Sequence, residues 1–347
     1  AGTSAATRAR PAPDSIPVMD TGTRAAGTGQ SVAPGYRRVA AIDIGTVTTR
    51  LLVADTDGSQ IREVVRRTIV THLGEGLHAS GALSVAGIAR VAAAVAGFVT
   101  DIGSSGAGSV VAVATSAARD AANGREFLDA VEAAGVRPRI IPGSVEARLS
   151  FTGATSGITG EGILIADLGG GSTELVLGSV RETDGVREVR VQAARSIDVG
   201  SRRVLDMFLV SDPPLTEELD RAAAWVAEQM KPFFAQLDQR PRELLTLAGT
   251  GTTLSAVKQH LEVYDPARVH GSCLSGAEVS DLLAELAAMD VESRRGVVGM
   301  DPARADVIVA GALILETIIA LAGLDGTTVS EHDILYGLVL AGPDGLD

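Results

Sequence analysis

Two short segments of the chain carry the same order of acidic, glycine and hydroxyl residues. The first begins at Asp43 and the second at Asp167, an offset of 124 residues that holds without a gap along both segments. Each segment lies between two short apolar runs, which predicts two strands joined by a tight turn. The residues that could do chemistry there are Asp43, Gly45, Thr46, Thr48 and Thr49 in the first segment and Asp167, Gly169, Gly170, Gly171, Ser172 and Thr173 in the second.

This pattern of residue types suits a phosphate group and a divalent cation. Glycine lacks a Cβ, so the backbone N–H groups of a turn can approach a phosphate closely. The hydroxyls can add hydrogen bonds to phosphate oxygens, and a carboxylate at each strand end can hold hydrated Mg²⁺. The alternative is that two unrelated hairpins happen to have glycine-rich turns. Because the two copies are in register, we expect two similar domains that face one another across a shared site.

A third glycine-rich segment, residues 247–254, follows one apolar run and precedes a helical one. It contains Gly249, Gly251 and Thr252. The N-terminus of the expected helix offers free N–H groups and the positive end of its dipole to an anion. Many α/β proteins carry such a turn, and the glycine spacing matches neither the dinucleotide-binding nor the Walker motif. This segment alone is therefore weak support for an anion site.

The elements that must position these residues alternate between strands and helices, which indicates an α/β protein. Apolar runs predict strands at residues 38–42, 51–54, 110–113, 140–141, 162–166, 175–177 and 244–247. Helical spacing predicts helices at residues 83–102, 123–135 and 215–236 and from residue 253 onward. Residues 1–37 show no sustained period and are expected to form a disordered tail. We expect one domain at residues 38–160 and a second at residues 161–347.

Composition restricts the classes of protein to which the chain can belong. Its 347 residues, 46% of them hydrophobic, are enough for two domains with their own cores. The formal net charge of -13 argues against nucleic-acid binding, which usually requires a basic surface. The apolar run at residues 307–322 is shorter than the ~20 residues of a membrane span and contains Glu316. We therefore expect a buried core helix there and no membrane segment.

Cysteine usage favours a reducing compartment. Cys273 is the only cysteine, so no intramolecular disulfide can form. The first residues show no basic segment followed by an apolar stretch, so no secretory signal is expected. These observations predict a cytoplasmic protein.

Five ordered segments together resemble the exopolyphosphatase and guanosine pentaphosphate phosphatase family, Ppx/GppA, in its short two-domain form. The resemblance runs over residues 39–340 and is most specific at residues 113–120, 167–174 (DLGGGSTE), 248–254, 304–308 and 330–337 (SEHDILYG). It implies an α/β protein of the actin-like ATPase (ribonuclease H-like) superfold, in which two duplicated domains flank a cleft. It also implies a Mg²⁺-dependent hydrolase of phosphoanhydrides.

The resemblance assigns roles to individual residues. Family members use a glutamate just before an Ala-Arg pair as the catalytic base, and here that residue is Glu146. Asp167 and Glu174 match the family's other functional acids, so they and Asp43 are the expected Mg²⁺ ligands. The arginines that match phosphate-facing arginines of the family are Arg50, Arg119 and Arg304. The first loop departs from the family pattern because Val47 stands where relatives commonly have asparagine, so affinity or chain-length preference is expected to differ.

Several functions are compatible with this resemblance. The enzyme could release terminal orthophosphate from inorganic polyphosphate, or it could act on guanosine pentaphosphate or tetraphosphate. A kinase of the same fold is disfavoured, because such kinases usually need larger insertions for an acceptor. A non-catalytic regulator that binds polyphosphate or nucleotide is the alternative from another class. The family often forms dimers, so a homodimer is an expectation, and longer relatives carry extra C-terminal domains, which predicts a preference for shorter chains here.

Overall fold

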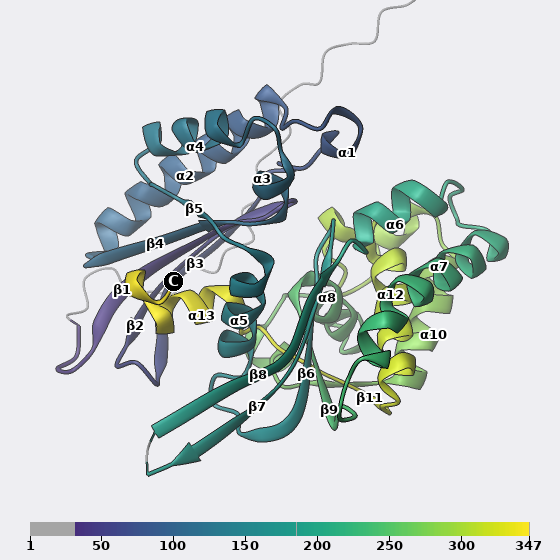
Figure 1. The fold of residues 1–347 in the computed structure, drawn as a ribbon. Helices are drawn as coiled ribbons and strands as arrows, with labels where there is room; N and C mark the ends of the chain where they lie inside the picture. The colour runs from purple at the N-terminus through teal and green to yellow at the C-terminus, as the bar shows by residue number, and fades with distance from the viewer. Residues whose placement is uncertain (1–31, 185, 347) are drawn as a thin grey trace, which may run out of the picture.

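The structure is a computed structural model and describes residues 32–184 and 186–346. These residues form two β-sheets with helices packed on them (Figure 1). The expected tail at residues 1–37 lies almost wholly outside the described residues, and the first strand begins at Arg37.

The first sheet has five strands in the order β3-β2-β1-β4-β5. They are β1 (Arg37–Ile44), β2 (Thr48–Thr56), β3 (Ile61–Val70), β4 (Ser109–Ala114) and β5 (Arg139–Ile140). The first three form an antiparallel meander, whereas β4 runs parallel to β1 and β5 runs parallel to β4. Residues 38–44 of β1 are all buried, because helices cover the sheet on both faces.

Two groups of helices cover the first sheet. One face packs against α2 (Val85–Ser105) and α4 (Gly124–Ala133), with the short α1 (Leu77–Ser80) and α3 (Ser116–Asp120) near them. The other face packs against α5 (Gly143–Ala154) and α13 (Ile334–Ala341). By length and composition alone α2 could cross a membrane, but Val91, Val95 and Phe98 place one side of it in the core of this sheet.

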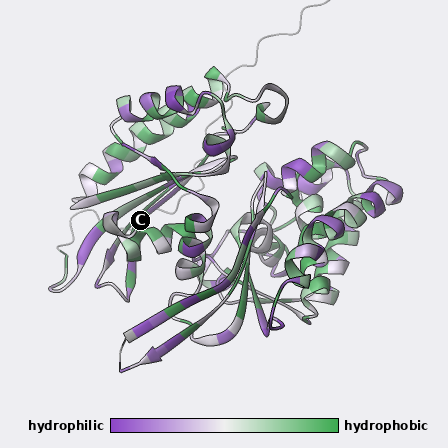
Figure 2. Cartoon of the chain, viewed as in Figure 1, coloured by the Kyte–Doolittle hydropathy of each residue, from purple (hydrophilic) through white to green (hydrophobic). Residues whose placement is uncertain are grey.

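The second sheet has six strands in the order β10-β11-β9-β6-β7-β8. They are β6 (Gly160–Leu168), β7 (Thr173–Thr183), β8 (Val186–Ile197), β9 (Glu243–Leu247), β10 (Cys273–Ser275) and β11 (Gly326–Val329). Here too a three-stranded antiparallel meander is followed by strands parallel to its first member, β9 and β11, whereas the edge strand β10 runs antiparallel to β11. The ends of β7 and β8 that lie far from the glycine turn at residues 169–171 extend past the core and carry hydrophilic residues (Figure 2). Five strands of the second sheet therefore repeat the order and directions of the first sheet, as the repeat predicts, and β10 is an additional edge strand.

A layer of helices covers one face of the second sheet. It contains α6 (Ser201–Phe208), α7 (Thr216–Ala235), α8 (Ala248–Lys258), α10 (Gly276–Ala287) and α12 (Ile308–Ala322). The short elements beside it are α9 (Pro266–Val269), α11 (Val291–Arg295) and the 3₁₀ turn η1 (Pro302–Arg304), and η2 (Pro343–Leu346) follows α13. The core helix expected at residues 307–322 is confirmed as α12, with most of its residues buried.

Helix α5 joins the two sheets. Leu149 packs with α13 on the first sheet, whereas Ala147, Phe151 and Ala154 pack on the second. Helix α13 comes from the segment expected to form the second domain, yet it packs on the first sheet. The chain therefore crosses between the two halves near residue 143 and again near residue 333, and both crossings lie beside the candidate site.

Candidate active site

A cavity of about 510 Å³ lies between the two halves and is lined by both glycine hairpins. Most of the residues predicted to act in catalysis or to bind metal or phosphate lie on its wall. Those that line the cavity are Asp43, Gly45, Thr46, Thr48, Arg50, Glu146, Asp167, Gly169, Gly170, Gly171, Ser172, Glu174, Gly249, Thr252 and Arg304. Residues far apart in the sequence therefore meet around one volume.

The two hairpins have the same strand register. Asp43 pairs with Arg50 across β1 and β2, and Asp167 pairs with Glu174 across β6 and β7. Both positions keep the offset of 124 residues, so the repeat seen in the sequence is a repeat of structure. Each acid is the penultimate residue of its strand, and both line the cavity.

The turns of the two hairpins are closed by the same backbone hydrogen bond. The Gly45 N–H donates to the Thr48 carbonyl at 2.9 Å, and the Gly169 N–H donates to the Ser172 carbonyl at 3.0 Å. The first turn is also held from outside, because the N–H groups of Thr71 and His72 donate to the Val47 carbonyl. Both turns thus present their glycines to the cavity in a fixed arrangement.

Alternation along the second strand of each hairpin decides which hydroxyls face the cavity. Thr48 and Ser172 line it. Thr49 and Thr173, one residue later, point the other way: the Thr49 hydroxyl pairs with that of Thr71, and the Thr173 hydroxyl donates to the Val199 carbonyl at 2.6 Å. The buried Thr173 hydroxyl therefore has a partner away from the cavity, and its phosphate contact stays a prediction.

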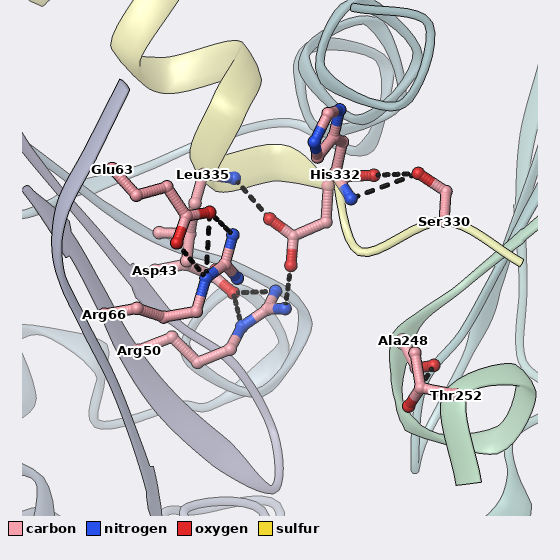
Figure 3. Close-up of polar contacts among 10 residues, drawn as sticks. Asp43, Arg50, Glu63, Arg66, Ala248, Thr252, Ser330, His332 and Leu335 are labelled. Carbon is pink, nitrogen blue, oxygen red and sulfur yellow. Dashed lines mark hydrogen bonds and ion pairs between the residues drawn. The ribbon is translucent and has the colours of Figure 1, made fainter. Parts of the chain in front are cut away.

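Asp43 is not free to act alone, because Arg50 holds it. The Arg50 guanidinium donates to Asp43 Oδ2 at 2.6 and 3.1 Å and also to Asp333 Oδ2 (Figure 3). Burial opposes the charge on Arg50, but the carboxylates of Asp333, Asp43 and Asp167 outweigh it and raise the pKa of Arg50. Burial raises the pKa of Asp43, although Arg50 opposes that shift.

Glu146 lies in the first turn of α5 and is 9% exposed. Its Oε2 accepts a hydrogen bond of 3.1 Å from Arg119, whose guanidinium also donates to the Ile141 carbonyl. Burial, and after it the negative charge of Glu174, raise the pKa of Glu146 to about 8, although Arg119 opposes the shift. Arg119 is not one of the cavity-lining residues, so its observed contact is with the candidate base.

Glu174 is held by two serine hydroxyls. Ser172 donates to its Oε1 at 2.9 Å from the same hairpin, and Ser196 donates to the same atom at 2.7 Å from β8. Burial raises the pKa of Glu174, although these two hydrogen bonds oppose the shift. The other carboxylate oxygen has no such hydrogen bond among the described residues.

Asp167 differs from the other three acids in its hydrogen bonding. It is partly buried and lines the cavity, and within residues 32–184 and 186–346 no side chain or backbone group hydrogen-bonds to its carboxylate. Burial, and then the charge of Glu174, raise the pKa of Asp167 to about 7. A partly buried carboxyl group with no protein partner is available to a cation or to a bound ligand.

The third glycine segment is helical from its start. Helix α8 begins at Ala248, five residues before the expected start, so Gly249 and Thr252 lie in its first turns. A Cβ at Gly249 would lie 1.7 Å from Arg304, so this glycine makes room for that guanidinium. The Thr252 hydroxyl donates to the Ala248 carbonyl at 3.3 Å (Figure 3). A Cβ at Gly251 would meet Thr246 of β9, and Gly251 is not among the residues that line the cavity, so its phosphate contact stays a prediction.

The acids do not form the expected three-carboxylate ligand set. Within the described ranges, no group of three or more His, Cys, Asp and Glu side chains is arranged to hold a metal ion. Asp43 is paired with Arg50, and one oxygen of Glu174 is taken by two hydroxyls. Mg²⁺ commonly binds through one or two carboxylates, substrate phosphates and several waters. The donor set, with Asp167 unpaired, fits an ion of that kind.

Three residues at the site were not found by sequence reasoning. Asp333 anchors Arg50 and caps α13 through the Leu335 N–H. Ser196 holds Glu174, and Arg66 on β3 lines the cavity. Asp333 lies within the segment at residues 330–337 that carries the family resemblance, which was the one available signal. Ser196 and Arg66 lie in strands that no motif marked.

Comparison with known proteins agrees with this geometry. The model of the Ppx/GppA phosphatase family matches residues 52–340. The chain is 39% identical to "Exopolyphosphatase 2" of Mycobacterium tuberculosis, over 88% of this chain and 98% of that protein. The solved Ppx/GppA enzyme of Aquifex aeolicus is 27% identical with a TM-score of 0.75 and coverage of 88% and 100%. An exopolyphosphatase structure from Cytophaga hutchinsonii is 25% identical with a TM-score of 0.80 and coverage of 90% and 99%.

These Ppx/GppA structures have the actin-like ATPase fold, and the two matching sheets around one cleft are that fold in this chain. The family match spans more than half of the chain, and the site places paired acidic hairpins and a buried glutamate around one cavity. The chain therefore belongs to the Ppx/GppA phosphatase family of phosphoanhydride hydrolases.

Proposed function

We propose that this protein is an exopolyphosphatase that releases terminal orthophosphate from inorganic polyphosphate. The observation that carries the proposal is the placement of Glu146 on the wall of the cavity that both glycine hairpins line. Its relative in Mycobacterium tuberculosis bears the name exopolyphosphatase. Hydrolysis of a phosphoanhydride needs a water in line with the bond, a base to orient it and positive groups on the phosphate oxygens.

In this proposal Glu146 accepts the proton of the attacking water. A base works best when its pKa is near the working pH, and the pKa of about 8 suits Glu146 to that role. Arg119 fixes the orientation of its carboxylate by the hydrogen bond of 3.1 Å. Thr48 and free N–H groups of the turns would bind the terminal phosphate, Ser172 would orient Glu174, and Arg304 would contact the chain from the other wall.

A bound Mg²⁺ would neutralise charge on the phosphate oxygens and polarise the scissile bond. We propose that Asp167 is its main protein ligand, with Glu174 and Asp43 nearby to hold its waters. The cavity wall supports the need for a cation: it carries nine carboxyl groups against four arginines. A polyanion entering that volume without cations would meet net repulsion.

A guanosine pentaphosphate 5'-phosphohydrolase is the second candidate function. The observation that favours it is an apolar part of the wall, formed by Leu261, Tyr264, Pro266 and Met300. An inorganic polyphosphate chain has no apolar group that could pack on such a surface, whereas a purine ring could pack on it. Both candidates use the same acids and the same hairpins.

Phosphate release from inorganic triphosphate, from long-chain polyphosphate and from guanosine pentaphosphate tests the proposal. We expect release from polyphosphate with Mg²⁺ and none after chelation. Glu146→Gln should lose roughly 10²–10⁴-fold in turnover while substrate still binds. Release from guanosine pentaphosphate alone would select the second candidate, and binding without release would indicate a regulator. Phosphate transfer from ATP to an added acceptor would indicate a kinase.

A further inference from the structure

Arg66 lines the cavity at the opposite end of a strand wall from the first glycine turn. Val70, Thr68 and Arg66 of β3 all face the cavity, because alternate residues of a strand point to the same side. Val70 pairs with Thr48 beside the turn, and Arg66 is four residues further along. At a rise of about 3.3 Å per strand residue, these two positions are about 13 Å apart. The wall therefore runs from the expected phosphate loop to a single arginine.

A β-bulge sets what Arg66 contacts. The pairing of β2 with β3 shifts between Val53 and Ala54, which pair with Val65 and Glu63, so Val64 is an extra residue. Residues three apart in a regular strand point to opposite faces, but the bulge places Glu63 on the same face as Arg66. The Arg66 guanidinium donates to Glu63 at 2.6 Å (Figure 3), and the Tyr336 hydroxyl also donates to Glu63, at 2.8 Å.

The guanidinium is held in place and kept charged. It lies 5.7 Å from the centre of the Tyr336 ring, and two of its nitrogens, Nε and Nη2, bond to Glu63. Burial opposes its charge, but the hydrogen bonds to Glu63 and the field of Asp333 outweigh that and raise the pKa of Arg66.

Two other carboxyl groups lie near Arg66, and both have partners. Asp333 is taken by Arg50 and by the N-terminus of α13. Glu331 accepts the hydroxyl of Tyr264, and burial raises its pKa. Glu63 differs from them because its side chain is 35% exposed and its partners are Arg66 itself and the Tyr336 hydroxyl. Of the three carboxylates near Arg66, Glu63 is therefore the one that a bound anion could displace with the smallest loss of free energy.

We propose that Arg66 is a distal subsite for a phosphate group of the substrate, and that Glu63 occupies this subsite when no substrate is bound. A phosphate presents to a guanidinium the same pair of acceptor oxygens that a carboxylate does. The ligand is a condensed inorganic phosphate chain long enough to reach from the hairpin turns to Arg66. The inference rests on the proposed exopolyphosphatase function and adds to it a residue that senses chain length.

The test compares two substitutions that are expected to change KM in opposite directions. Arg66→Gln should raise KM for long-chain polyphosphate roughly 10- to 100-fold, as expected for a lost charged hydrogen bond, with kcat unchanged. Glu63→Gln frees the arginine and should lower that KM. Neither change should alter KM for inorganic triphosphate, which is too short to reach Arg66.

Matched controls come from the other face of the same strand. Arg67 pairs with Asp101 of α2 at 2.9 Å, away from the cavity, so Arg67→Gln and Asp101→Asn make the same charge changes there. Both controls should leave KM unchanged for every chain length. Thermal unfolding of all four variants shows whether a change in KM comes instead from a loss of folded structure.

The outcomes separate this inference from the function on which it rests. If the parent protein releases no phosphate from triphosphate or polyphosphate, the proposed function itself fails. If the parent cleaves both but Arg66→Gln and Glu63→Gln alter the KM of long chains no more than the controls do, the subsite is refuted. An effect of Arg66→Gln that is confined to guanosine pentaphosphate also refutes it, because the distal ligand would then be a nucleotide.

Discussion

Val47 and Gly170 bring the two glycine hairpins into contact: a Cβ at Gly170 would lie 2.4 Å from Val47 Cγ2. The side chain of valine is stiff at χ1, so it cannot easily turn away from an added methyl group. Gly200 packs against the other side of Gly170, where its own Cβ would meet the Gly170 backbone at 2.4 Å. The second turn therefore lies between the first turn and the segment before α6, with no room for a larger residue.

This contact predicts that Gly170→Ala separates the hairpins. A displacement of about 1 Å at a catalytic site can cost on the order of 10²-fold in rate, and we expect a loss of that order in kcat/KM for polyphosphate. Gly97→Ala is the control, because a Cβ at that position in α2 meets nothing within 4 Å. The double variant Val47→Ala/Gly170→Ala removes the clash and should recover most of the activity. Full activity of Gly170→Ala would show that the hairpins are not fixed by this contact.

The raised pKa of Glu146 predicts the pH dependence of catalysis. A base must be deprotonated, so kcat/KM should fall about tenfold for each pH unit below about 8 in the free enzyme. Arg119 favours the charged carboxylate, so Arg119→Gln should raise the pKa of Glu146. The acidic limb of the pH profile, where kcat/KM falls, should then move to higher pH. The measurement is kcat/KM against pH for both proteins. A limb near pH 4 to 5 in the parent would contradict the assignment of Glu146 as the base.

Asp333 is predicted to stabilise the fold and to position Arg50. Asp333→Asn keeps an oxygen for the Leu335 N–H but loses the charge that Arg50 contacts. Both side chains are largely buried, so we expect a loss of about 1–3 kcal/mol in the free energy of unfolding, measured by urea denaturation. Asp129→Asn breaks an exposed pair with Arg125 and should change stability little. Equal effects of the two substitutions would show that Asp333 is no more than a surface acid.

The sequence by itself determined the two hairpins and much of the cavity wall. An Asp, a glycine turn and a hydroxyl residue between two apolar runs are local signals, because turn geometry and strand alternation act over a few residues. The offset of 124 residues then predicted the same register in both copies, as Asp43 with Arg50 and Asp167 with Glu174 confirm. The helix at residues 307–322 was also predicted from a local signal, its run of apolar residues.

Only the tertiary structure decided which partners those residues meet. Asp333 is 283 residues from Arg50, and no local pattern links them. Ser196 reaches Glu174 because β8 pairs with β7, and Arg66 shares a face with Glu63 because of one extra residue in β3. The type of Thr173 suits phosphate, but strand alternation turns its hydroxyl to the Val199 carbonyl. Residue types and short spacings are fixed by the chain, whereas the pairing of distant strands is set by packing of the whole core.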